Sequence, residues 1–340
     1  MAAADNGNNT GGDRSPTAYT EDIIIGLVIF IPCLIWLILY LLVAWVFARC
    51  PIFYRNSCYQ LMLSLSVSDC INLIGWLIIS SNIFLHGNVY NDTFFTAVLV
   101  ANFGGWRNLS WHQAVLAFNR YAATCQHVKY PIFFTPRRTG LLIAAAWLHS
   151  IVWASLAFIP PHITFYLDGY YEDFPNHIMA KFYLVEDTIC SAFCLFCCAF
   201  CYSKILLKYR ETRRLVAAAM TDQDQIPKSQ SQLKQEKKSV TQFRLALQVF
   251  LGSIIYATNA IGFYMVVGVD MNPWLAFFIA TYTGPLNNGI SVVIYLIFNK
   301  ELRLEMRKRF FPWEISCHKA HSGIQRSAGM IANIQNRPPN

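Results

Sequence analysis

The sequence predicts an all-α membrane protein: a bundle of seven transmembrane helices followed by a short amphipathic helix on the inner leaflet. Composition is the first observation that predicts it. Of the 340 residues, 55% are hydrophobic and only 14% are charged, whereas a soluble domain carries about 25% charge. The hydrophobic residues are also concentrated in seven long blocks. Finally, basic residues gather in alternate connections between these blocks.

Each block approaches the roughly 20 residues that a helix needs to cross about 30 Å of hydrocarbon. Runs of this length favour helices over barrel strands, because a helix satisfies its backbone polar groups within the segment. The fourth block is the shortest. The predicted spans are Ile23–Phe47, Cys58–Phe84, Thr93–Tyr121, Leu141–Phe158, Leu184–Leu207, Phe243–Val267 and Trp274–Phe298.

The location of the basic residues predicts the orientation. All but three of the 27 Lys and Arg residues lie at or between the inner ends of the spans; the exceptions are Arg14, Lys181 and Arg107, the last inside a span. Since basic residues accumulate on the cytoplasmic side, we expect a multi-pass plasma-membrane protein with its N-terminus outside and its C-terminus inside. The net charge of +8 is then a topology signal, and no nucleic-acid partner is expected.

The segments outside the spans divide the chain further. The polar N-terminus lacks periodicity, which is typical of disorder, and the segment after the last span mixes apolar and basic faces, as expected for a helix in contact with membrane lipid. The predicted organisation is a disordered extracellular N-terminus at 1–22, the seven-transmembrane domain at 23–298, an amphipathic helix at 299–312 and a disordered cytoplasmic tail at 313–340.

Three positions are candidates for covalent modification. Asn8 and Asn91 occur in glycosylation sequons on the predicted outer side, whereas the sequon at Asn108 lies inside a span and is discounted. Cys317 follows the amphipathic segment and is a candidate for palmitoylation, although many juxtamembrane cysteines are unmodified.

Asp69 lies near the middle of the second span. A charged residue at this depth is costly and needs a partner. Asp69 could bind sodium, remain protonated, or bond to Asn287 or Asn288, and both a structural and a functional role are open. With Tyr295, these residues form the predicted polar core of the bundle.

Arg107 lies in the outer half of the third span and should face the bundle interior, because facing lipid would cost several kcal/mol. Glu186 or Asp187, near the outer end of the fifth span, is its expected partner. These charges could anchor a ligand pocket or form a structural ion pair, and the sequence leaves both open. The candidate pocket residues are Trp106, Arg107, Glu186, Asp187, Tyr264 and Tyr282.

No catalytic or metal-binding pattern is present. Five cysteines between Cys190 and Cys201 share one predicted helix, but tetrahedral ligands cannot converge from one straight helix, so packing is the preferred interpretation. No cysteine falls in a predicted outer loop, which excludes an extracellular disulfide. We expect no metal, no cofactor and no enzymatic activity.

Several segments resemble one known superfamily in their order and spacing. Phe118–Tyr130 (FNRYAATCQHVKY) resembles the DRY segment and following loop of rhodopsin-like G-protein-coupled receptors, and Leu65–Asp69 (LSVSD) resembles their second-helix motif. Trp147 and Tyr295–Arg303 match the fourth helix and the start of the eighth. With Ser57–Met62 (SCYQLM), the chain is most similar to nematode serpentine chemoreceptors of classes x and t.

The resemblance implies a chemosensory receptor that binds a small-molecule ligand in the outer half of the bundle and activates a heterotrimeric G protein. The sixth helix would move outward to expose Arg120. The residues it implies for G-protein coupling are Asn119, Arg120, Tyr121, Arg137 and Arg138. The alternative is a ligand-gated channel or a membrane transporter, although no repeat between the halves supports a transporter.

The chain also departs from the superfamily pattern. Asn119 replaces the usual acidic residue, so the acid–arginine clamp is absent, and Ser291-Val292 replaces Asn-Pro. The sixth span lacks the tryptophan–proline switch. These departures put the detailed activation switch in doubt but leave the topology intact.

Overall fold

The computed structural model describes residues 16–86, 89–159, 164–166, 171–173, 178–221, 230–268 and 273–310. Helices account for nearly all of these residues, as the sequence predicts. The elements are α1 (Pro16–Arg49), α2 (Pro51–Tyr54), α3 (Ser57–Phe84), α4 (Asp92–Cys125), α5 (Tyr130–Phe133), α6 (Pro136–Ala157), β1 (Thr164–Tyr166), β2 (Tyr171–Asp173), α7 (Ile178–Thr221), α8 (Gln230–Gly268), α9 (Pro273–Ala276), η1 (Phe277–Tyr282), α10 (Thr283–Phe298) and α11 (Lys300–Phe310).

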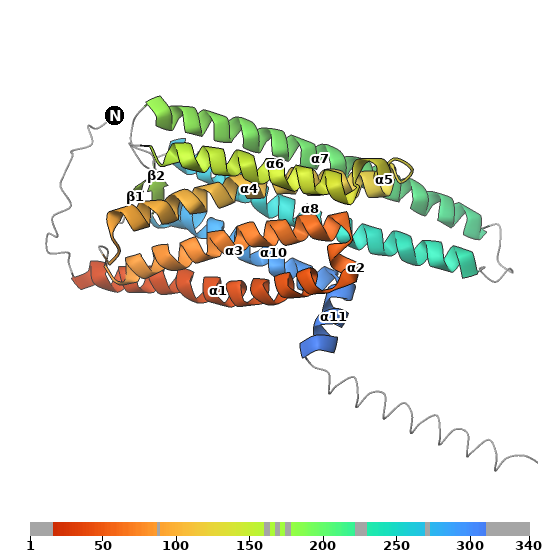
Figure 1. Ribbon diagram of the computed structural model, residues 1–340, viewed down its shortest axis with the longest axis horizontal. Helices are drawn as coiled ribbons and strands as arrows, with labels where there is room; N and C mark the ends of the chain where they lie inside the picture. The colour runs from red at the N-terminus through yellow and green to blue at the C-terminus, as the bar shows by residue number, and fades with distance from the viewer. Residues whose placement is uncertain are drawn as a thin grey trace, which may run out of the picture.

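Among the described residues, seven long helical segments run side by side along the long axis of the molecule (Figure 1). They are α1, α3, α4, α6, α7, α8 and the η1–α10 segment. α4 is the central helix, because it packs against α3, α6, α7 and α8. α10 contacts α1, α3 and α8 and so closes the bundle, while α11 turns away from the bundle axis at the inner end (Figure 1).

Five of the long helices are both long and apolar enough to cross a membrane: Tyr19–Arg49, Ser57–Phe84, Pro136–Ala157, Lys181–Thr212 and Phe243–Gly262. The remaining two predicted spans fall on α4 and on η1–α10. α4 is rich in polar residues that are buried among its neighbours, which its central position permits. α10 has 16 residues, and the preceding η1 supplies the rest of the crossing.

The first and seventh helices differ from the predictions. α1 begins at Pro16, so the residues from Pro16 to Asp22, which we expected to be disordered, are helical. Proline is well suited to a first helical position. The predicted seventh span is divided into α9, the π-helical η1 and α10. Pro285 in α10 explains the wider turn, because its ring clashes with the carbonyl four residues earlier in a regular helix.

Two further features were not predicted. The outer connection after α6 contains a short antiparallel hairpin, in which Thr164 pairs with Asp173 and Tyr166 with Tyr171. Aromatic and β-branched residues favour this extended pairing. α7 and α8 have 44 and 39 residues, about 66 and 58 Å at 1.5 Å per residue, so both project beyond the inner end of the bundle (Figure 1).

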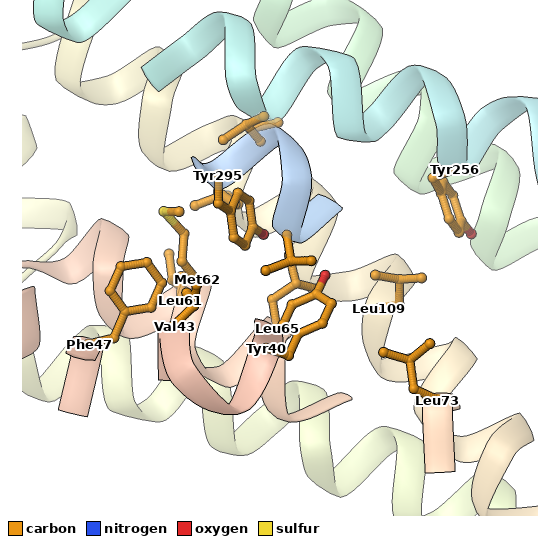
Figure 2. Close-up of a cluster of buried hydrophobic side chains, with 14 of the residues drawn as sticks. Tyr40, Val43, Phe47, Leu61, Met62, Leu65, Leu73, Leu109, Tyr256 and Tyr295 are labelled. Atoms are coloured by element: carbon orange, nitrogen blue, oxygen red, sulfur yellow. The ribbon is translucent and has the colours of Figure 1, made fainter. Parts of the chain in front are cut away.

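The apolar side chains are distributed as expected for a protein surrounded by lipid. Inside the bundle, Tyr40, Val43 and Phe47 of α1 gather with α3 residues and with Tyr295 of α10 (Figure 2). On the outside, large apolar side chains are exposed, such as Phe196 with 69% of its surface accessible. An apolar exterior of this extent marks a membrane or interaction surface.

The amphipathic helix α11 is anchored to the inner end of the bundle. The Asn299 side chain accepts a hydrogen bond from the Leu302 amide (3.0 Å) and donates to the Tyr59 hydroxyl (3.3 Å). The Cys50 thiol lies 3.8 Å from Glu305 Oε2, and burial raises the pKa of this thiol.

Gly289 of α10 packs directly against Trp36 of α1. A Cβ atom at this position would overlap the indole ring of Trp36. We expect Gly289→Ala to destabilise the fold by about 1–3 kcal/mol, because a large rigid ring must move in a packed interior. Thermal unfolding of the purified protein measures this loss. The double variant Gly289→Ala/Trp36→Leu should recover stability, and an unchanged unfolding temperature in the single variant would contradict the packing argument.

Candidate functional site

The polar triplet Asn119-Arg120-Tyr121 lies at the inner end of α4, and its first two residues are buried. Asn119 is fully buried and Arg120 is 3% exposed. The Arg120 guanidinium donates a hydrogen bond to Asn119 Oδ1, and Asn119 Nδ2 in turn donates to the Tyr130 hydroxyl (3.4 Å) in α5. Tyr121 is half-buried, with its ring 6.2 Å from that of Phe200 on α7. Asn119 therefore provides Arg120 with a neutral acceptor where an acid would provide a charged one.

The neighbouring inner loop is held by short-range contacts. Thr135 caps α6, because its side chain accepts a hydrogen bond from the Arg138 amide (3.2 Å). The Arg138 guanidinium donates to the Ile132 carbonyl. Arg137 and Arg138 are both exposed at the first turn of α6. Their role in G-protein coupling stays a prediction.

The predicted polar core contains a partner that sequence reasoning missed. The Tyr40 hydroxyl of α1 is a donor 2.7 Å from Asp69 Oδ2 and 2.8 Å from the Asn288 carbonyl. Asn72 Nδ2 donates to Asn288 Oδ1 (3.5 Å). The side-chain partner of Asp69 is thus Tyr40 rather than either predicted asparagine, and Asn288 joins through its backbone. The Asn287 carbonyl accepts a hydrogen bond from the Ser291 hydroxyl within α10. The sodium and protonation alternatives for Asp69 stay predictions.

The outer half of the bundle brings Arg107 of α4 to both predicted carboxylates of α7. Its Nη1 donates to Glu186 and lies 3.3 Å from Asp187 Oδ1, and its Nη2 donates to the Tyr183 carbonyl (3.2 Å). The guanidinium also lies 4.8 Å from the centre of the Phe103 ring. Arg107 has no exposed surface, whereas the Glu186 and Asp187 side chains are 19% and 13% exposed. The carboxylates are consequently the accessible part of this cluster, and Arg107 positions them.

His149 of α6 extends the charged cluster and was not predicted. Its Nδ1 accepts a hydrogen bond from Trp111 Nε1 (3.1 Å), and its Nε2 lies 3.5 Å from Glu186 Oε1. An indole N–H can only donate, so Nδ1 carries no hydrogen in this arrangement. The hydrogen is then on Nε2, directed at Glu186. A histidine in the fourth span was the available signal.

The aromatic candidates separate into two groups. The Trp106 ring lies 4.9 Å from that of Tyr256, whose hydroxyl bonds to Ser110 (2.6 Å) and Ser191 (3.0 Å). Tyr256 was missed by the sequence reasoning, although a tyrosine within an apolar span was its signal. Tyr282 instead packs against Phe277 and Phe278. The side chain of Tyr264 lies outside the described residues.

Comparisons with known proteins identify the family. Residues 12–319 match the sequence profile of the serpentine type 7TM GPCR chemoreceptor Srt family. The chain belongs to this family. No functionally curated protein matches its sequence. The crystal structure of squid rhodopsin is similar in fold, with a TM-score of 0.70, 16% sequence identity, and coverage of 90% of this chain and 89% of that chain.

These comparisons confirm the predicted superfamily and the seven-helix architecture. A serpentine receptor of this fold is a multi-pass membrane protein, and its family consists of receptors rather than enzymes. In the receptor, Trp147 Nε1 donates to the Ser64 hydroxyl (2.9 Å) and so joins α6 to α3. The motif tryptophan of the sequence thus has a structural role between helices.

The predicted modification sites and the metal-binding prediction remain to be compared with the structure. Asn91 caps α4, because its Oδ1 accepts a hydrogen bond from the Thr93 amide (2.9 Å), and its glycosylation stays a prediction. Asn8 and Cys317 lie outside the described residues. Within the described part of the chain, no three His, Cys, Asp or Glu side chains are arranged to hold a metal ion.

Proposed function

We propose that this serpentine receptor is a chemosensory receptor of the plasma membrane, with an extracellular N-terminus and a cytoplasmic C-terminus. It binds a small extracellular molecule in the outer half of the bundle and activates a cytoplasmic heterotrimeric G protein. The observation that carries the proposal is the arrangement of α4. This one central helix holds Arg107 among the outer carboxylates and Arg120 at the inner end.

The outer cluster supports the ligand-binding part of the proposal. Glu186 and Asp187 are partly exposed beside the buried Arg107, and Trp106 provides an aromatic surface one residue away on α4. Polar groups that converge in a largely apolar setting are typical of small-molecule sites. A ligand that bonds to these carboxylates would act on α4 and α7 together. Tyr264 and Tyr282 stay candidate pocket residues from the sequence.

The inner end supports the coupling part. Arg120 and Tyr121 lie where α4 ends, and the exposed Arg137 and Arg138 lie in the first turn of α6. A ligand changes the equilibrium between two bundle packings only if it binds one of them better. In the favoured packing, α8 moves outward and Arg120 becomes accessible to the G protein. Glycosylation at Asn8 and Asn91 and palmitoylation at Cys317 are part of the same proposal.

Nucleotide exchange on purified G proteins tests the proposal. Full-length receptor in lipid nanodiscs is combined with G proteins of several classes and a panel of small organic compounds. We expect at least one compound to accelerate exchange, and Arg120→Ala to abolish this acceleration. Arg55→Ala, which changes an exposed basic residue of the inner surface, should retain it.

The same preparation distinguishes a receptor from a channel or transporter. A current evoked by the active compound in planar bilayers without G protein, and unchanged by Arg120→Ala, would overturn the proposal in favour of a ligand-gated channel. Exchange that is equally fast with wild type and Arg120→Ala would contradict the role assigned to the inner end of α4.

A further inference from the structure

The charges of the outer cluster do not balance. Arg107 contributes one positive charge, whereas the ionised side chains of Glu186 and Asp187 contribute two negative charges. His149 adds no charge in this arrangement, because its Nδ1 accepts the hydrogen bond from the Trp111 indole. The cluster therefore carries an excess of one negative charge.

The nearest basic residue along α7, Lys181, lies on a different face of the helix from both acids. It is exposed, and it precedes Glu186 and Asp187 by five and six positions. With 3.6 residues in each turn, these separations place it about 140° and about 120° around the helix from the two acids. Arg14, the other basic residue predicted on the outer side, lies outside the described residues.

Acidic residues are also concentrated on the predicted outer side of the membrane. Eleven of the 19 Asp and Glu residues occur there, against three of the 27 Lys and Arg residues. These acids belong to the N-terminal segment, the outer connections and the outer end of α7. Asp and Glu have little influence on membrane orientation, so their excess is separate from the signal that sets the topology. A region with one sign of charge attracts ligands of the opposite sign and speeds their arrival.

Asp187 faces the interior of the bundle, close to two aromatic rings. It belongs to the buried stripe of α7, with Tyr183 one turn outward and Ser191 one turn inward. The Ser191 hydroxyl bonds to the Tyr256 hydroxyl (3.0 Å), and the Tyr256 ring lies 4.9 Å from the Trp106 ring. Aromatic rings attract ammonium groups through their negative faces. A carboxylate beside an aromatic pair is thus a combination that suits an organic cation.

We propose that the ligand of the outer site is an organic cation, with an ammonium group that binds at Asp187 and an apolar body. An unbalanced charge inside a membrane protein is costly, so a cation that restores neutrality gains more than an uncharged molecule of the same shape. Glu186 is engaged by Arg107 and lies 3.5 Å from His149 Nε2, which leaves the ammonium group to Asp187. This inference names the ligand class of the proposed function and rests on the outer site of that function.

Thermal unfolding of the purified full-length receptor tests the proposal, because a ligand that binds the folded state raises the unfolding temperature. The receptor is kept in a maltoside detergent, which has neither a charge nor a choline headgroup. The probes are choline and phenethylammonium. Each is compared with an uncharged analogue: the carbon isostere of choline, in which a quaternary carbon replaces the nitrogen, and phenylethanol. We expect both cations to raise the unfolding temperature, and the analogues to require an about ten-fold or higher concentration for the same rise.

Asp187→Asn identifies the carboxylate that binds the cation. The substitution removes the excess charge and leaves the pair between Arg107 and Glu186, so we expect the variant to fold. The cations should then require an about ten-fold or higher concentration than with the wild type. Glu211→Gln is the matched control, because it removes an exposed acid of the same helix that pairs with Lys208, and it should respond like the wild type.

No rise with either cation, or equal rises with a cation and its uncharged analogue, would overturn the proposal. A folded Asp187→Asn variant that responds to the cations as the wild type does would also overturn it. If this variant does not fold, the comparison of charged and uncharged probes on the wild type still decides the question.

The outcome is separable from that of the proposed function, because none of these measurements uses a G protein. A receptor that binds the cations through Asp187 but never stimulates nucleotide exchange would leave this inference intact and contradict the proposed coupling. Nucleotide exchange stimulated by uncharged compounds alone would leave the proposed function intact and overturn this inference.

Discussion

Arg107→Met should strongly destabilise the receptor fold. Methionine is an apolar side chain of similar length, so the substitution removes the cation that lies near Glu186 and Asp187. Breaking a buried ion pair by removing one partner costs about 3–5 kcal/mol, because it leaves the other charges uncompensated. Proteins are stable by only about 5–15 kcal/mol. We expect a large fall in the unfolding temperature of the purified protein and in the amount of receptor at the cell surface.

Two variants identify the cause of this loss. The triple variant Arg107→Met/Glu186→Gln/Asp187→Asn removes the uncompensated charges as well, so it should regain much of the lost stability. Arg55→Met changes an exposed arginine near the Tyr54 ring and should unfold like the wild type. If Arg107→Met alone unfolded at the wild-type temperature, the ion pair would have no role in holding α4 to α7.

The pairing of Arg107 with the two acids could be predicted from sequence because intramembrane charges are rare and have few possible partners. The partners of neutral hydrogen-bonding side chains are harder to predict from the sequence. Tyr40 costs little in a span, and the histidine at His149 indicates a polar partner without indicating which one, so the sequence does not specify pairing with Asp69 or Glu186. Their roles depend on which helices become neighbours, and the α1–α3 and α6–α7 arrangements appear only in three dimensions.

The spans themselves were predictable for a related reason. Long apolar blocks and basic inner connections each reflect the membrane directly. Element boundaries near the ends of the spans do not. The helical residues from Pro16 to Asp22 and the hairpin formed by Thr164–Tyr166 and Tyr171–Asp173 carry no such signal in the sequence. The π-helical η1 could not be predicted from the sequence either, because a proline such as Pro285 is compatible with a kink, a break or a wider helical turn.

Asn119→Asp should lower ligand-free nucleotide exchange. Asn119 already accepts a hydrogen bond from Arg120 and contacts the Tyr130 hydroxyl. Aspartate would keep the acceptor for Arg120, add a charge, and accept from the Tyr130 hydroxyl. A neutral hydrogen bond contributes about 0.5–1.5 kcal/mol and a charged one about 1.5–3. The difference of about 1–2 kcal/mol changes an equilibrium about 5–30-fold, in favour of the packing in which Arg120 is covered.

Two comparisons separate the charge effect from loss of the loop contact. Tyr130→Phe removes only the bond between α5 and Asn119, so it should raise basal exchange slightly. Asn119→Leu removes the acceptor of Arg120 as well and should raise basal exchange further. If Asn119→Asp reached the membrane in wild-type amounts and its basal exchange were unchanged, the contact between Asn119 and Arg120 would not hold the resting packing. The presence of asparagine in place of an acid would then have no effect on how firmly the resting packing holds Arg120.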